Sequence, residues 1–169
     1  MGVIEVPALS LWQPWAWLLV HGHEHANGKR IENRRWPLPE SACGRWCLIH
    51  AAKRGATEKE LLAARCVARA AGLPAPDLPW CNEQLMQTNA AGAVVAAFGG
   101  IVGAVKWGAP ADCEAHYSSP WWAGPFGWPT LDAKVLPFVA WRGRQGLFGV
   151  PLSGLPAAYQ WLGKEASDE

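Results

Sequence analysis

The period of apolar and polar residues changes several times along the chain. Runs that alternate or that are rich in β-branched residues predict strands, at residues 3–11, 29–36, 44–53, 93–107, 126–131, 135–142 and 146–150. Apolar residues spaced three and four apart predict helices, at residues 14–20, 57–71, 82–89 and about 154–163. We therefore expect one α+β domain over residues 1–169, built as a small mixed β-barrel with inserted helices rather than a doubly wound sheet.

Two of these helices have start signals. Pro14 fits the first turn of a helix because it has no backbone donor, and Gln13 would then be the capping residue. Thr57 and Glu60 have the spacing of a capping box, in which each side chain accepts a hydrogen bond from the other's backbone N–H. The first helix should end at Gly22.

The segment from 29 to 36 has charges of both signs beside a tryptophan. Period-two alternation would place Glu32, Arg34 and Trp36 on one side, and Lys29 would reach the same cleft from its loop end. The alternative is a surface ion pair of Glu32 and Arg34, which would contribute under about 1 kcal/mol. Together with the tryptophans that precede it, we interpret the segment as the floor of a binding cleft.

Composition limits the possible functions. Half of the 169 residues are hydrophobic and 17% are charged, as in a packed globular protein. The net charge of +1 gives no global attraction to nucleic acid, so a site for it must be a local patch. Most of the 12 tryptophans should pack in the core, while a minority in a cleft could stack on bases. No apolar run is long enough to cross a bilayer and no signal peptide is evident, so we expect no membrane association and a cytoplasmic protein.

No metal or cofactor is expected. The five cysteines lack the two-residue gap of zinc and redox motifs, which favours reduced thiols. Three alternating histidines, His21, His23 and His25, lie in a predicted loop. Alternating imidazoles can bind a metal ion, but ordering a mobile loop costs free energy. A solvated loop is therefore the favoured interpretation.

Several stretches of the chain occur in the order seen in ASCH domains. They are LSLWQPWAWLLVHG, GKRIENRRW, GRWCLIHAAK, GGIVGAVKW and FGWPTLDAKVLPFVAWRGRQGLFGV. From about residue 9 to residue 150, the chain resembles this family. The resemblance implies a PUA-like fold, which is a small β-barrel with inserted helices.

The family signature G-x-K-x-x-E-x-R is matched in part. Lys29, Glu32 and Arg34 keep its spacing, and Gly28 directly precedes Lys29. With Gly22 as the family glycine, the His-rich loop is an insertion of several residues.

ASCH domains are similar to RNA- and nucleic-acid-binding modules; some relatives act as coactivator domains and others hydrolyse nucleic-acid components. The resemblance implies a cleft between the first helix and the barrel. There arginine and lysine could bind phosphate, tryptophan could stack on an unpaired base, and Glu32 could accept from a cytosine amino group or a sugar hydroxyl. The predicted binding residues are Trp12, Gln13, Trp15, Lys29, Glu32, Arg34, Arg35, Trp36 and Lys53. Single-stranded RNA or DNA, or a modified base, suits such a cleft better than a duplex.

Hydrolysis is the alternative function. Small bacterial relatives that deacetylate N4-acetylcytidine use a Lys, a Glu and a Thr nucleophile three residues after the Lys, and here that position is Glu32. A carboxylate does not replace a hydroxyl nucleophile, which favours a binding module. Glu32 could still activate water, with Lys29 or Lys53 stabilising the oxyanion. A metal-independent ribonuclease would use His50, Lys53 and Glu32, although His50 is better explained as a packed strand residue.

A third class of function is protein recruitment. It would use exposed Trp121 and Trp122 with the Pro-rich segment at 73–81. This class ranks last, because such tryptophans more often pack in the core.

Overall fold

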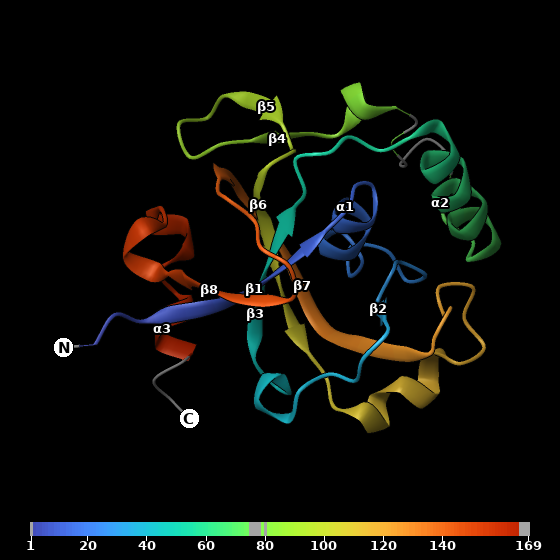
Figure 1. The fold of residues 1–169 in the computed structure, drawn as a ribbon. Coiled ribbons are helices and arrows are strands. Elements are labelled where there is room, and N and C mark those ends of the chain that lie inside the picture. The colour runs from blue at the N-terminus through green and yellow to red at the C-terminus, as the bar shows by residue number, and fades with distance from the viewer. Residues whose placement is uncertain (1, 75–78, 80, 166–169) are drawn as a thin grey trace.

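An open six-stranded sheet forms the centre of the molecule (Figure 1). The structure is a computed structural model that describes residues 2–74, 79 and 81–165. The strands of the sheet are β1 (Glu5–Leu11), β2 (Ile31–Arg34), β3 (Trp46–Ala51), β6 (Gly100–Trp107), β7 (Phe126–Ala140) and β8 (Leu147–Pro151). Their order is β2-β7-β6-β3-β1-β8, and all neighbours are antiparallel except β1 and β3. Because β1 and β3 are parallel, their carboxyl ends lie at the same end of the sheet.

The α+β class is confirmed, but the predicted closure into a barrel is not observed. β2 and β8 form the two edges of the sheet, and no ladder joins them within the described part of the chain. β2 has only four residues, and its ladder partner is β7.

The helices are α1 (Trp15–Val20), α2 (Glu58–Ala70) and α3 (Leu162–Glu165). A separate hairpin consists of β4 (Met86–Thr88) and β5 (Val94–Ala96). Short 3-10 turns occur at Glu40–Ala42, Asn82–Gln84, Pro110–His116, Leu152–Gly154 and Ala157–Tyr159. The helices predicted at 14–20 and 57–71 are confirmed.

Helix α1 packs between the sheet and α2. Its residues Ala16 and Leu19 are fully buried in one hydrophobic cluster with Leu9 and Trp107 of the sheet. Leu18 belongs to a second cluster, with Ile31 of β2 and Ala64 and Ala68 of α2. This two-sided burial holds the segment between β1 and β2 in place.

The strands predicted at 126–131 and 135–142 form one continuous strand, β7. Its first part pairs with β2 and its second part with β6, so its main-chain groups have partners along its length. Asp132, interpreted as a breaker, pairs with Lys106 in the ladder to β6. The separation into two strands was therefore wrong.

The helix predicted at 82–89 is also wrong, because the segment is a 3-10 turn followed by β4. The Gln87 side chain donates hydrogen bonds to the carbonyls of Val102 (2.7 Å) and Leu136, which tie β4 to the main sheet. The terminal helix predicted at about 154–163 is replaced by a 3-10 turn and α3.

The Pro-rich segment at 73–81 lies partly outside the described residues, since 75–78 and 80 are not described. Among the helices that are described, none has the length and apolar character needed to cross a membrane.

Candidate functional site

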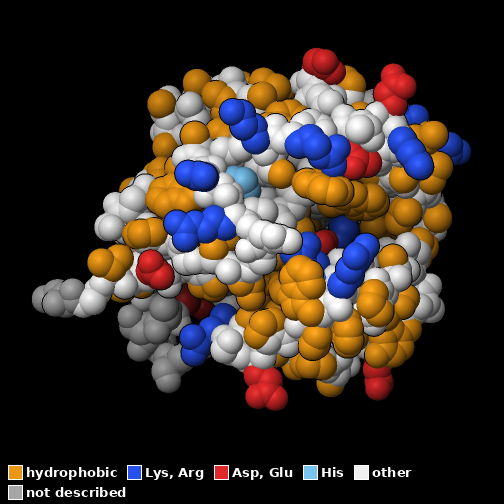
Figure 2. Space-filling view, in the orientation of Figure 1, with side chains coloured by type: hydrophobic (Ala, Val, Ile, Leu, Met, Phe, Trp, Pro, Cys, Tyr) orange, Lys and Arg blue, Asp and Glu red, His pale blue; other side chains and the backbone are white. Residues whose placement is uncertain are grey.

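A cleft of about 520 Å³ lies at the opening between the edges of the sheet. It is lined by Ser10, Leu11, Trp12, Trp15, Glu32, Arg34, Trp36, Arg144, Gln145 and Gly146. These residues come from the end of β1, the start of α1, the edge strand β2 and the segment before β8. Figure 2 shows a hollow on this face of the molecule, bordered by hydrophobic side chains and containing basic and acidic ones.

The floor of the cleft is a charge network on β2. Glu32 and Arg34 share one face, as the alternation predicted, and Glu32 Oε1 lies 3.7 Å from an Arg34 guanidinium nitrogen. Lys29 precedes β2, so its direction is not set by the strand, and its Nζ donates to Glu32 Oε2 at 2.9 Å and to the Ile31 carbonyl. Lys29 is only 3% exposed. It therefore holds Glu32 from below and does not line the cleft itself.

Two exposed tryptophans form the rims. Trp12 is 58% exposed and Trp36 is 41% exposed. Each has a guanidinium over its ring: Arg54 lies 4.2 Å from the Trp12 ring centre, and Arg34 lies 4.6 Å from that of Trp36. Cations stacked on aromatic rings orient them, so these rings are held although they are exposed.

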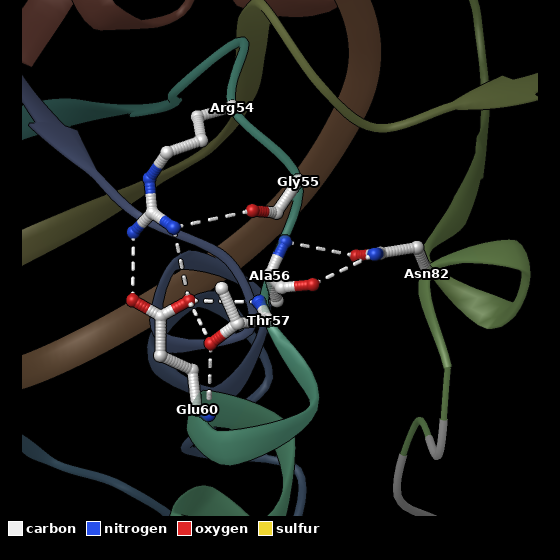
Figure 3. Close-up of polar contacts among 6 residues, drawn as sticks. All are labelled: Arg54, Gly55, Ala56, Thr57, Glu60 and Asn82. Carbon is white, nitrogen blue, oxygen red and sulfur yellow. Dashed lines mark hydrogen bonds and ion pairs between the residues drawn. The ribbon is translucent and has the colours of Figure 1, made fainter.

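The start of α2 fixes Arg54 (Figure 3). The predicted capping box is present, because Glu60 N–H donates to Thr57 Oγ1 at 3.2 Å and Thr57 N–H donates to Glu60 Oε2 at 2.8 Å. Arg54 donates to both oxygens of Glu60, at 2.7 and 3.1 Å, and these bonds lower the pKa of Glu60 to about 2. Asn82 bonds both the N–H and the carbonyl of Ala56, which holds the approach to the helix. Arg54 therefore connects the cap of α2, through Glu60, with the rim of the cleft at Trp12.

The His-rich loop is closed at its base by two glycines. A Cβ on Gly22 would lie 1.8 Å from the Lys29 carbonyl oxygen, and one on Gly28 would lie 2.0 Å from the Gly22 carbonyl oxygen. Only glycine permits such a close approach of two backbones. The intervening residues loop out, and Gly22 lies directly beside Lys29.

The loop histidines bond to neighbouring side chains. His21 Nδ1 lies 2.7 Å from Glu24 Oε2, and His23 Nε2 lies 2.9 Å from Thr130 Oγ1. Burial, followed by the charge of Arg30, lowers the pKa of His23. The part of the chain that is described contains no group of three or more side chains placed to hold a metal ion.

Four predicted binding residues do not line this cleft, namely Gln13, Lys29, Arg35 and Lys53. Gln13 is fully buried, where its Nε2 donates to the Ala97 carbonyl at 2.9 Å and its Oε1 accepts from the Trp17 N–H at 3.0 Å. Its side chain therefore joins the first turn of α1 to Ala97, the residue after β5. Arg35, directly after β2, is exposed and does not line the cleft. Lys29 lies beneath the floor.

Lys53 lines an adjoining cleft of about 550 Å³. Its lining is Ser10, His50, Ala52, Lys53, Gly99, Trp141, Arg142, Gly143, Arg144 and Gln145. The two clefts share Ser10, Arg144 and Gln145. The shared residues make one continuous depression at the carboxyl ends of β1 and β3.

Sequence reasoning missed Ser10, Arg54, Arg144 and Gln145. The signal for the last two was the segment WRGRQGLFG, which carried the family resemblance but was assigned no role. Nothing in the sequence placed Arg54 over Trp12.

Trp121, predicted as part of a recruiting surface, is buried (5% exposed), and its Nε1 donates a hydrogen bond to the Asn27 carbonyl. It is therefore not free to recruit a partner.

No family model matches this chain, and no curated protein matches it.

Proposed function

We propose that the cleft between Trp12 and Trp36 binds single-stranded RNA or DNA, or a modified base. The proposal depends mainly on two exposed tryptophans, Trp12 and Trp36, which line the same cleft and each have an arginine over the ring. The floor of that cleft is charged. A cleft of about 520 Å³ accommodates a nucleoside-sized group. Exposed aromatic rings of this kind stack on unpaired bases irrespective of sequence.

Polar groups in the cleft could fix the orientation of the ligand. Arg34 has a buried Nε with no hydrogen-bond partner among the described residues, and a buried donor of this kind is costly to leave unpaired. A ligand phosphate or carbonyl would satisfy it. Arg144 is exposed on the rim and adds a second positive charge for the backbone of a strand.

The same geometry supports membership of the ASCH family with a PUA-like fold. The signature residues Lys29, Glu32 and Arg34 form one bonded group. Gly22, when taken as the signature glycine, lies against Lys29 despite the insertion. The close contact between the backbones of Gly22 and Lys29 is what we expect if the His-rich loop is an insertion between them.

Binding is favoured over hydrolysis by Glu32 and Lys29. Glu32 has Lys29 on one oxygen at 2.9 Å and Arg34 beside the other at 3.7 Å. These two cations lie beside both carboxylate oxygens, the atoms with which Glu32 would take a proton from water. These residues are better suited to recognise a ligand than to activate water.

The test is binding of short fluorescent single-stranded RNA and DNA to the full chain. Trp12→Ala and Trp36→Ala should each weaken binding by about 1–3 kcal/mol, the usual contribution of a base stacked on an aromatic ring. The matched control is Tyr117→Ala, since Tyr117 is 56% exposed but does not line the cleft. It should leave the affinity unchanged.

Competition with a duplex and with N4-acetylcytidine separates the ligand classes. Displacement by the nucleoside alone identifies a modified base as the ligand, and a single strand that outcompetes the duplex identifies an oligonucleotide. If neither tryptophan variant alters the affinity, or if Tyr117→Ala weakens it equally, the cleft is not the binding site.

A further inference from the structure

The second cleft contains a serine and a histidine in direct contact. Ser10 and His50 are register partners in the parallel ladder of β1 and β3, so their side chains emerge side by side from the same face. Ser10 Oγ lies 3.1 Å from His50 Nδ1. His50 is only 3% exposed, whereas Ser10 is half-buried and lines both clefts.

The partners of His50 determine where its proton is. Its Nε2 lies 2.9 Å from the Trp141 carbonyl oxygen, which can only accept, so Nε2 carries the proton. Burial lowers the pKa of His50, which keeps the ring neutral and leaves Nδ1 as a bare acceptor. Ser10 O–H therefore donates to Nδ1. Ser10 as nucleophile, His50 as base and the Trp141 carbonyl as the group that orients the base form the chain of hydrogen bonds that activates a serine.

Position 143, next to the pair, has room only for glycine. A Cβ there would lie 2.8 Å from Ser10 Oγ and 2.7 Å from His50 Nδ1. Any side chain at this position would occupy the space in front of the hydroxyl. Lys53, Arg142 and Arg144 line the same cleft, so its charged lining is positive.

We propose that Ser10 is a nucleophile activated by His50, and that the second cleft hydrolyses carboxylic esters whose alcohol part is anionic. Ser10 Oγ attacks the acyl carbon while its proton moves to His50 Nδ1, and the lysine and arginine side chains stabilise the oxyanion. When the tetrahedral intermediate collapses, the C–O bond to the alcohol breaks and His50 returns the proton to the leaving oxygen. Water, deprotonated by His50, then cleaves the acyl-serine ester and restores the hydroxyl.

This activity goes beyond the proposed binding function and does not depend on it. The tryptophan rims belong to the first cleft, whereas His50, Lys53 and Arg142 line the second. Loss of oligonucleotide binding in Trp36→Ala would therefore leave Ser10 reactivity intact, and the two failures are distinguishable.

The test combines covalent labelling with ester hydrolysis on the full chain. Diisopropyl fluorophosphate should add one diisopropylphosphoryl group to Ser10, located by peptide mass spectrometry. The wild-type protein should release acetate from 4-acetoxybenzoate, and Ser10→Ala and His50→Gln should each reduce that rate by about 100-fold or more, as expected for loss of nucleophile or base.

Ser153→Ala is the matched control, because Ser153 is an exposed serine outside both clefts. It should leave labelling and hydrolysis unchanged. Circular dichroism of Ser10→Ala establishes that the variant is folded, and labelling of the unmutated chain needs no variant at all. An unlabelled Ser10 in the wild-type protein, or equal hydrolysis by Ser10→Ala and wild type, overturns the proposal.

Discussion

Two regions of this molecule combine tryptophan with a nearby cation, and they differ in what the rings face. At the cleft, Trp12 and Trp36 each have one guanidinium over the ring and remain 58% and 41% exposed. In the other region, Trp46 of β3 and Trp161 pack edge to face, with ring centres 4.8 Å apart at 87°, and Lys134 lies 4.2 Å from the Trp161 ring. A tryptophan beside a cation is therefore not in itself a sign of a binding site.

The cavities beside the two regions differ as well. The cavity at Trp46 measures about 80 Å³, against about 520 Å³ for the cleft. The two lie at opposite ends of β1, about 20 Å apart at a rise of about 3.3 Å per residue. One end of the strand has aromatic rings that pack against one another, and the other end has exposed rings beside a larger cleft.

Removal of the buried Lys29 under the cleft should change the free energy of unfolding more than removal of Lys134 in the other region. Lys29→Ala should lower the free energy of unfolding by about 3–5 kcal/mol, because it leaves the buried Glu32 carboxylate without its closest partner. Lys134→Ala should cost about 1 kcal/mol or less, since Lys134 is exposed and its Nζ lies over the rings of Trp46 and Trp161. Urea unfolding of both variants measures this. Equal losses would show that Lys29 is no more important to the fold than a surface lysine.

The salt dependence of binding should also differ between variants of the two regions. Arg144→Ala and Lys134→Ala each remove one positive charge, but only Arg144 lines the cleft. Arg144→Ala should reduce the slope of log affinity against log salt by about 0.7 for a single strand. Lys134→Ala should leave the slope as it is. Titration of labelled RNA over a range of salt concentrations provides the measurement, and equal slopes in the two variants would indicate attraction to the whole surface rather than to the cleft.

The sequence predicted correctly those features that depend only on residues close together in the chain. The capping box at Thr57 depends on spacing within one turn, and the shared face of Glu32 and Arg34 depends on strand alternation. Both were found from the sequence. Gln13 was predicted to be a binding residue, but its side chain is buried and donates to the carbonyl of Ala97, a residue distant in sequence.

Long-range pairing explains the larger errors. Asp132 ends a hydrophobic run in the sequence, yet β6 pairs across it and the strand continues. Closure of a barrel likewise depends on whether two edges meet, which no local pattern encodes. Arg54 over Trp12 and Ser10 beside His50 join residues about 40 positions apart. Only the register of β1 against β3 could have indicated the second of these pairs.

The smallest expected effect is the pH dependence of stability at the cleft end of β3. Burial lowers the pKa of His50 in the folded chain, while in the unfolded chain it titrates near 6.5. Below that pH the unfolded chain binds more protons than the folded one, so stability is lost as pH falls from about 6.5 towards the folded pKa of His50. Urea unfolding at pH 7.5 and pH 5.5 should show a smaller loss for His50→Gln than for wild type. His23 and His116, whose pKa values burial also lowers, should retain part of the dependence. An unaltered pH dependence in His50→Gln would mean that His50 is protonated equally in the folded and unfolded chains.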